Sequence, residues 1–327
     1  MKTFTYAIIS VGIGLNLIFG GCSLQKTASQ TQEAGSFSSF VDWCENKREL
    51  SEEARKTVNA LLFIAETNKC TDASENLVSL TELELANTDL SDLRPLSSLT
   101  NLTTLYLSAN EISDVSPLQS LTKLTSLYLR DNDISYLSPL KSLTNLKGLD
   151  LTANQVSNIS PLKSLTKLTN LVIGKNKIED LSPLKSLTKL ETIYLSDNKI
   201  EDLSPLESLT NLKVIDLSDN QISELSPLEP LTKLEAIYLR DNEISNLIPL
   251  ESLTKLKTIH LSDNEISNLS PLSSLTKLQM IHLSNNEISN LSPLSSLTQL
   301  QMVHLKGNQL LYETCPFEPE EICQFDQ

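Results

Sequence analysis

The sequence of 327 residues is poor in the residues that most catalytic and cofactor sites require. It has 8 glycines, and only Gly148, Gly174 and Gly307 lie beyond residue 35, so a glycine-rich phosphate loop is excluded. It has 3 histidines, which leaves little material for acid–base or metal chemistry. The net charge of −15, from 26 Lys and Arg against 41 Asp and Glu, argues against an electrostatic grip on nucleic acid.

The residues that are present do not form a catalytic set either. All five cysteines lie before or after the region that holds the histidines, so no Cys–His pair is expected. Paired carboxylates are frequent, but they fall in polar turn segments without an apolar pocket to raise the pKa of one of them. We therefore expect a protein that is not an enzyme and carries no cofactor.

Residues 1–21 are typical of a secretory signal peptide. Lys2 precedes a mostly apolar run over residues 7–19, which is too short to span a bilayer. The run ends in Phe-Gly-Gly before Cys22, which resembles the lipobox of bacterial lipoproteins and implies a lipidated Cys22. The polar segment that follows, completing residues 22–36, is expected to be a flexible tether. An ordinary signal peptide with an incidental cysteine is the alternative.

A unit of 22 residues repeats without a gap from Leu80 onward. Residues 102–123 and 124–145 align position by position, and ten full copies precede a partial eleventh that starts at Leu300. Each unit reads L-x-x-L-x-L-x-x-N-x-[IVL]-x-x-[LIV]-x-P-L-x-x-L-x-x. This pattern resembles the leucine-rich-repeat family, in its short internalin-like class, over residues 80–311. The resemblance implies a right-handed solenoid.

The same residues predict this fold on physical grounds. Leu105 and Leu107 alternate with Tyr106, which is the period of a strand with one buried face, and parallel stacking of such strands buries the leucines. Ser-Pro-Leu recurs in eight of the ten full units, with Arg94-Pro95 and Ile248-Pro249 as the exceptions, and it predicts a short 3-10 or helical turn with the serine as N-cap. The predicted fold is an α/β solenoid: an arc with about eleven parallel concave strands and short convex turns.

An asparagine follows each strand of the predicted arc. Its buried amide is expected to bond the turn backbone of its own and of the next coil. The first copy has Thr88 at this position. The predicted ladder comprises Asn110, Asn132, Asn154, Asn176, Asn198, Asn220, Asn242, Asn264, Asn286 and Asn308.

Both ends of a solenoid need a cap. Over 37–79 we predict a helical cap, with one helix over 51–66 that starts at Ser51 and a second that starts at Asp72. Residues 312–327 are the predicted C-terminal cap. Apart from Cys22, the four cysteines can pair in three ways. The pairs Cys44–Cys70 and Cys315–Cys323 form the only set that does not bring the two ends of the solenoid together, and such disulfides favour export.

The strand residues that point away from the core are the candidate binding residues. Tyrosine and arginine often anchor protein interfaces, and histidines fill the end of the same column. The alternative is that aromatic residues simply favour strands. The candidates on the predicted concave face are Tyr106, Tyr128, Arg130, Tyr194, Tyr238, Arg240, His260, His282 and His304.

Three columns of side chains contain possible metal ligands. His260, His282 and His304 stack with Met280 and Met302 beside them, a set that suits a soft ion. However, a straight ladder does not bring three ligands to one point, and repeat duplication accounts for the column, so no metal site is predicted. The turns after the strands carry acidic columns (Asp131, Asp197, Asp219, Asp241 and Asp263; Glu111, Glu243, Glu265 and Glu287), for which a solvated face is favoured over a calcium or basic-partner site.

The sequence therefore indicates an exported, lipid-anchored protein of a bacterial cell envelope, at the outer membrane or cell surface. Its concave face is predicted to bind an unidentified protein or envelope glycan, with adhesion implied by the family resemblance. We expect no nucleic acid partner, and contact with the membrane only through the N-terminal lipid. The alternative is a structural spacer or scaffold with no specific ligand.

Overall fold

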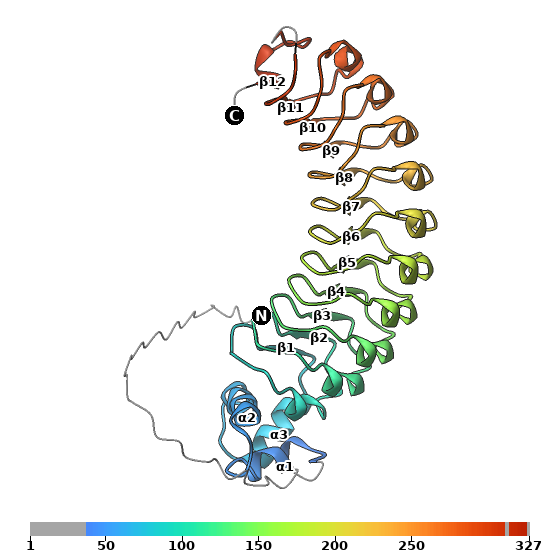
Figure 1. Ribbon diagram of the computed structural model, residues 1–327. Helices are drawn as coiled ribbons and strands as arrows, with labels where there is room; N and C mark the ends of the chain where they lie inside the picture. Colours follow the sequence, from blue (N-terminus) through green and yellow to red (C-terminus); the bar gives the residue numbers. More distant parts are fainter. Residues whose placement is uncertain (1–36, 311–313, 326–327) are drawn as a thin grey trace, which may run out of the picture. The chain divides into compact units, whose positions relative to one another are not determined.

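The computed structural model describes residues 37–310 and 314–325. The predicted signal peptide over 1–21, the lipidation of Cys22 and the tether over 22–36 lie outside the described residues. Within the described part, residues from Phe37 onward form one compact unit. In this unit, short strands line the inner side of a curved solenoid and 3-10 helices line its outer side (Figure 1).

One parallel sheet runs through the whole solenoid, with its strands in sequence order. Neighbouring strands pair in register at a spacing of one repeat, for example Leu105 with Leu127. The strands are β1 (Glu82–Glu84), β2 (Thr104–Tyr106), β3 (Ser126–Tyr128), β4 (Gly148–Asp150), β5 (Asn170–Val172), β6 (Thr192–Tyr194), β7 (Val214–Asp216), β8 (Ala236–Tyr238), β9 (Thr258–His260), β10 (Met280–His282), β11 (Met302–His304) and β12 (Cys323–Gln324). The eleven predicted strands are confirmed, and the C-terminal cap adds a twelfth.

The core is a continuous stack of leucine and isoleucine side chains between the strands and the outer turns. Leu105, Leu107, Ile112 and Leu118 of one copy are all fully buried, and the corresponding residues of the other copies are buried in the same way. Each such side chain stabilises the fold by about 1.5–3 kcal/mol when it leaves water. Because a coil shares these contacts with its neighbours, the stack is stable only as a series.

A short 3-10 helix forms at the Pro-Leu sequence of each full repeat, which Ser precedes in all but η1 and η8. The helices are η1 (Arg94–Leu96), η2 (Ser116–Ser120), η3 (Ser138–Ser142), η4 (Ser160–Ser164), η5 (Ser182–Ser186), η6 (Ser204–Leu206), η7 (Ser226–Leu228), η8 (Ile248–Leu250), η9 (Ser270–Ser274) and η10 (Ser292–Ser296). The prediction that serine is the N-cap is wrong. In η2 the serine is the first helical residue, and the N–H of Ser116 donates to Oδ1 of Asp114 at 2.8 Å. The carboxylate or amide two residues upstream supplies the acceptor because Val115, at the cap position itself, has no polar side chain.

The asparagine ladder joins each coil to the one before it, not to the one after it as predicted. Nδ2 of Asn198 donates to the carbonyl of Leu195 in its own coil at 3.0 Å and to Ile173 of the preceding coil at 3.2 Å. Its Oδ1 accepts the N–H of Ile178, also in the preceding coil, at 3.0 Å. One buried amide therefore satisfies backbone groups that the turn leaves without partners.

The acidic column beside the ladder has a backbone cause. The residue before each ladder asparagine adopts a left-handed conformation, with φ of 54° at Asp131, 55° at Asp197 and 57° at Asp219. Aspartate and asparagine tolerate this region better than other residues with a Cβ. The turn geometry therefore accounts for the repeated aspartate without a bound cation.

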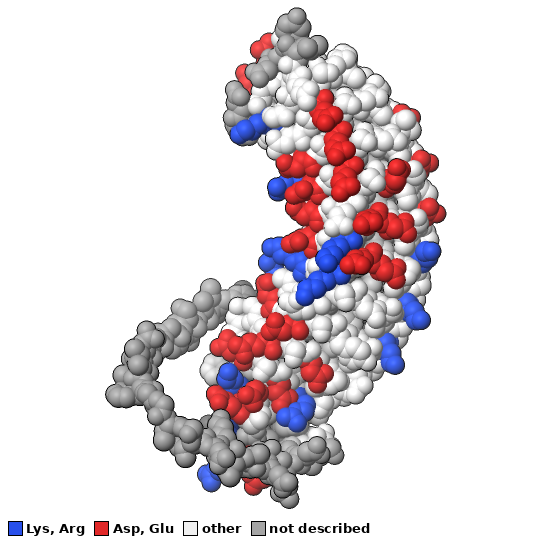
Figure 2. Space-filling model, in the orientation of Figure 1, with Lys and Arg blue, Asp and Glu red and all other residues white. Residues whose placement is uncertain are grey.

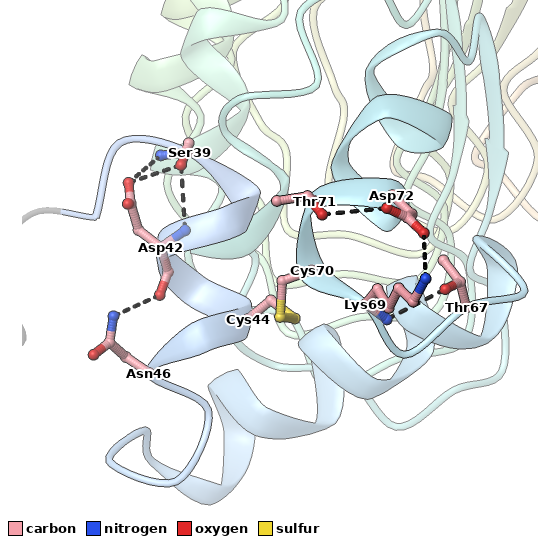
Figure 3. Close-up of a disulfide and its surroundings, with 9 residues drawn as sticks. All are labelled: Ser39, Asp42, Cys44, Asn46, Thr67, Lys69, Cys70, Thr71 and Asp72. Atoms are coloured by element: carbon pink, nitrogen blue, oxygen red, sulfur yellow. Dashed lines mark hydrogen bonds and ion pairs between the residues drawn. A yellow bond between two sulfur atoms is a disulfide. The ribbon is translucent and has the colours of Figure 1, made fainter.

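Three helices cover the N-terminal end of the solenoid: α1 (Phe40–Glu45), α2 (Glu52–Ile64) and α3 (Cys70–Val78). The N–H of Ala54 donates to Oγ of Ser51 at 3.2 Å, as predicted for α2. Helix α3 starts at Cys70, two residues before the predicted Asp72. Helix α1 was not predicted. Cys44 of α1 and Cys70 of α3 form a disulfide that ties the two helices together (Figure 3).

The other end of the solenoid is closed by a short cap. Cys315 and Cys323 form a disulfide, and the 3-10 helix η11 (Glu320–Ile322) leads into β12. The N–H of Leu305 in the last repeat donates to the carbonyl of Gln324 at 2.8 Å. Strand β12 therefore pairs with the edge of β11, which would otherwise present free backbone groups.

Candidate functional site: the concave face

Beside a column formed by the first residue of each strand, the third residue of each of the strands β1 to β11 forms an outward column of side chains on the concave face. Tyr106, Tyr128, Tyr194 and Tyr238 stand in this column and are half-buried. The rings of Tyr106 and Tyr128 stack at 4.7 Å and 3°. Tyr194 on β6 and Tyr238 on β8 lie three and five strands beyond Tyr128. The residues between them in the column are Asp150, Val172 and Asp216, so the structure does not gather the four tyrosines into one cluster.

The N-terminal tyrosine pair lies beside acidic residues of β1. Burial raises the pKa of Tyr106, and the nearby Glu82 and Glu84 raise it further. Burial likewise raises the pKa of Tyr194. These phenol groups are therefore uncharged hydrogen-bond donors at neutral pH.

Histidines continue the column at the C-terminal end. The ring of Tyr238 meets His260 edge-on at 6.5 Å, His260 and His282 lie 4.5 Å apart, and His282 and His304 stack at 4.3 Å and 14°. Burial lowers the pKa of His282 to about 4, and the neighbouring His260 and His304 act in the same direction. Burial and Arg240 lower the pKa of His260. The rings of His260 and His282 are therefore uncharged at pH 7.

The two candidate arginines are held by neighbouring carboxylates. Nε of Arg130 lies 3.0 Å from Oδ2 of Asp131, and Nε of Arg240 lies 3.0 Å from Oδ2 of Asp263 in the next coil. The hydrogen bond to Asp263 raises the pKa of Arg240. Because both pairs are largely exposed, they orient the guanidinium groups more than they stabilise the fold.

The turns beside the concave face carry mostly acidic side chains, with basic side chains near the middle of the solenoid. Figure 2 shows Asp and Glu side chains gathered in rows, interrupted by Lys and Arg near the middle of the solenoid. In the sequence, the acidic columns are interrupted by Lys175, Lys177 and Lys199. Burial raises the pKa of Asp219, and the nearby positive charge of Arg240 lowers it in part.

A shallow hollow on the concave face was not predicted from the sequence. It measures about 310 Å³ and lies between Tyr128, Asp150 and Asn170, with Gly148 among its lining residues. A Cβ placed on Gly148 would meet only Oγ of Ser126, at 3.9 Å, so the missing side chain leaves the space open. The sequence signal for this hollow was Gly148 itself, because the other repeats have a larger residue at the equivalent position.

Neither a metal cluster nor a membrane span is found in the described ranges. Among residues 37–310 and 314–325, no three imidazole, thiol or carboxylate groups are grouped as metal ligands. Over the same ranges, no helix combines the length and the apolar composition needed to cross a membrane.

The parallel sheet, the asparagine ladder and the outer 3-10 helices define a leucine-rich-repeat solenoid. The family model described as leucine-rich repeats (2 copies) matches residues 78–120, 122–164, 146–186, 166–208, 188–230, 232–274 and 276–316. None of the curated proteins compared with the chain matches it.

Solved structures show which branch of the leucine-rich-repeat proteins the chain resembles. An internalin, InlF from Listeria monocytogenes, is 33% identical, with a TM-score of 0.68 and coverage of 78% of this chain and 82% of that one. The functional domain of InlJ from Listeria monocytogenes, described as including a cysteine ladder, is 26% identical with a TM-score of 0.69. That match covers 84% of this chain but only 57% of the InlJ chain. The chain belongs to the internalin-like leucine-rich-repeat proteins.

Proposed function

We propose that the chain is an envelope-anchored binding module whose concave face binds another protein. Internalin-like repeats generally mediate protein–protein interaction, and solenoids use their concave surface for it. The observation that carries the proposal is the outward column itself. Asp150 and Asp216 occupy the same column as the tyrosines, so the strands do not require an aromatic residue there. Tyr106, Tyr128, Tyr194 and Tyr238 are therefore available for binding.

The proposed partner is a surface or secreted protein, with an adhesion-like role. Tyrosine supplies a large contact area at low entropic cost, and its phenol group can donate a hydrogen bond to a partner. Arg130 and Arg240 are already oriented by their carboxylate partners and add charge at two separate points of the face. An envelope glycan is the second ligand class that would suit this polar aromatic surface. No catalytic role is proposed.

The proposed location is outside the cytoplasm. Two disulfides are typical of an oxidising compartment. We propose that residues 1–21 are a signal peptide, that Cys22 is lipidated, and that residues 22–36 tether the cap (37–79) and the repeats (80–311), with 312–327 closing the far end. A spacer with no specific ligand is the competing function.

A capture experiment separates binding from a spacer role. We expect the purified chain to retain a discrete protein or glycan from envelope and extracellular extracts. Replacement of the four concave tyrosines by alanine should abolish retention, since interface tyrosines commonly contribute about 2 kcal/mol or more each. Tyr136→Ala is the matched control because Tyr136 is 65% exposed but lies in the turn before η3, outside the sheet.

Each other outcome of the capture experiment contradicts the proposal. Equal retention by the native chain and the four-tyrosine variant would place binding on another surface. Retention lost equally in the Tyr136→Ala variant would remove the assignment to the concave face. If the native chain retains nothing, the spacer function replaces the binding function.

A further inference from the structure

Soft donor atoms are concentrated at one place in the molecule. All 3 histidines lie between residues 260 and 304, and so do two of the 3 methionines, the remaining one being Met1. Strands β10 and β11 both read Met-x-His, and they pair in register, Met280 with Met302 and His282 with His304. Since alternate residues of a strand point to the same face, the four side chains share the concave face.

The structure brings His282, Met302 and His304 into contact. Nε2 of His304 lies 2.9 Å from Sδ of Met302, so a thioether and an imidazole converge on the same strand. The ring of His282 stacks on that of His304 at 4.3 Å. Met280 is 37% exposed, which leaves this corner of the array open to solvent. His260 stands outside the array because β9 has Thr258 where the next two strands have methionine.

The donor set discriminates between classes of metal ion. Thioether and imidazole ligands suit soft ions such as Cu(I), whereas calcium and magnesium require oxygen ligands. The array itself contains no carboxylate. The thiols of Cys44, Cys70, Cys315 and Cys323 are joined in disulfides and do not compete for a soft ion. Lys306, two residues beyond His304, adds a positive charge that disfavours a divalent ion more than a monovalent one.

We propose that Met280, His282, Met302 and His304 form a binding site for one soft monovalent metal ion, Cu(I) or Ag(I), on the concave face. The terminal torsion of a histidine is broad, so the ring of His282 can turn its nitrogen toward an ion held by His304 and Met302. This site differs from a ladder of three histidines, in which the ligands do not converge. The proposal is independent of any protein partner.

The test uses Ag(I) as the probe and the purified full chain with Cys22→Ser as the common background, because a Cys22 thiol would itself bind Ag(I). We expect one Ag(I) per chain in a titration, together with shifts of the ring nitrogen resonances of His282 and His304. The Met280→Leu/Met302→Leu variant keeps the side-chain volume and should bind Ag(I) about tenfold more weakly or worse. His260→Gln is the matched control, and its affinity should stay within about twofold of the native value.

Several results would overturn the site. Native affinity in the double leucine variant would show that the thioethers are not ligands. A loss in His260→Gln as large as that in the double variant would show general surface binding to imidazoles. Binding without a shift of the His282 and His304 resonances would also refute it. Far-ultraviolet circular dichroism of each variant confirms that the fold is unchanged in the comparison.

Discussion

Replacement of Asn198 by alanine is expected to lower the free energy of unfolding by about 1–3 kcal/mol. The change removes the acceptor for the N–H of Ile178 and the donors to the carbonyls of Ile173 and Leu195. Asn198 is 9% exposed, so water does not readily replace the lost bonds. A buried polar group left without a partner costs about 1–3 kcal/mol. Urea denaturation followed by circular dichroism measures the effect.

An exposed asparagine at the end of the same repeat provides the control. Nδ2 of Asn211 donates to the carbonyl of Thr188 at 2.9 Å, but this contact lies at the surface. Asn211→Ala should therefore cost within about 0.5 kcal/mol, as most surface substitutions do. Equal costs at the two positions would show that the ladder is not the connection that holds successive coils together.

The second large loss of stability is expected when the N-terminal disulfide is removed. The Cys44→Ala/Cys70→Ala variant should lose about 3.5 kcal/mol of stability, because the closed loop restricts the unfolded chain and spans a sequence separation of 26. The bond also fixes α1 against α3, and these helices cover the first coil. Trp43 of α1 contacts both Phe37, at 4.9 Å, and the guanidinium of Arg94, at 5.3 Å. Thermal unfolding under non-reducing conditions measures the loss.

The C-terminal disulfide is the internal comparison for this prediction. Cys315 and Cys323 are separated by 8 residues, so the same loop-closure relation gives about 2.5 kcal/mol for their replacement by alanine. The N-terminal pair should therefore have the larger effect by about 1 kcal/mol. A larger loss from the C-terminal pair would contradict the assignment of the stabilisation to loop closure.

Sequence reasoning predicted the repeated part of the fold well because its signal is reinforced in every copy. Alternation of Leu105, Tyr106 and Leu107 fixes which side chains enter the core, and the proline at Pro117 marks the outer turn. The sequence signal is weaker for elements that occur only once in the chain. Helix α1 has only six residues, and its signal was the local pair of Ser39 and Asp42, which form a capping box. Strand β12 has two residues and no pattern of its own.

The direction of polar contacts could not be predicted from spacing. Asp114 and Ser116 are both good capping residues, and only the backbone geometry shows that the aspartate accepts the bond. The ladder amides reach back to the preceding coil, and the 22-residue spacing is the same in both directions. For the candidate site, the column was predictable, but ring stacking and the pairing of Arg240 with Asp263 depend on side-chain torsions.

The most direct test of the account is a hydroxyl-radical footprint of the chain with its captured partner. The central claim is that the concave face is the binding surface. The account predicts that Tyr106, Tyr128, Tyr194 and Tyr238 become protected in the complex, while Tyr136 keeps the reactivity of the free chain. Protection of Tyr136 with no change at the four concave tyrosines would contradict the claim and place the partner outside the sheet.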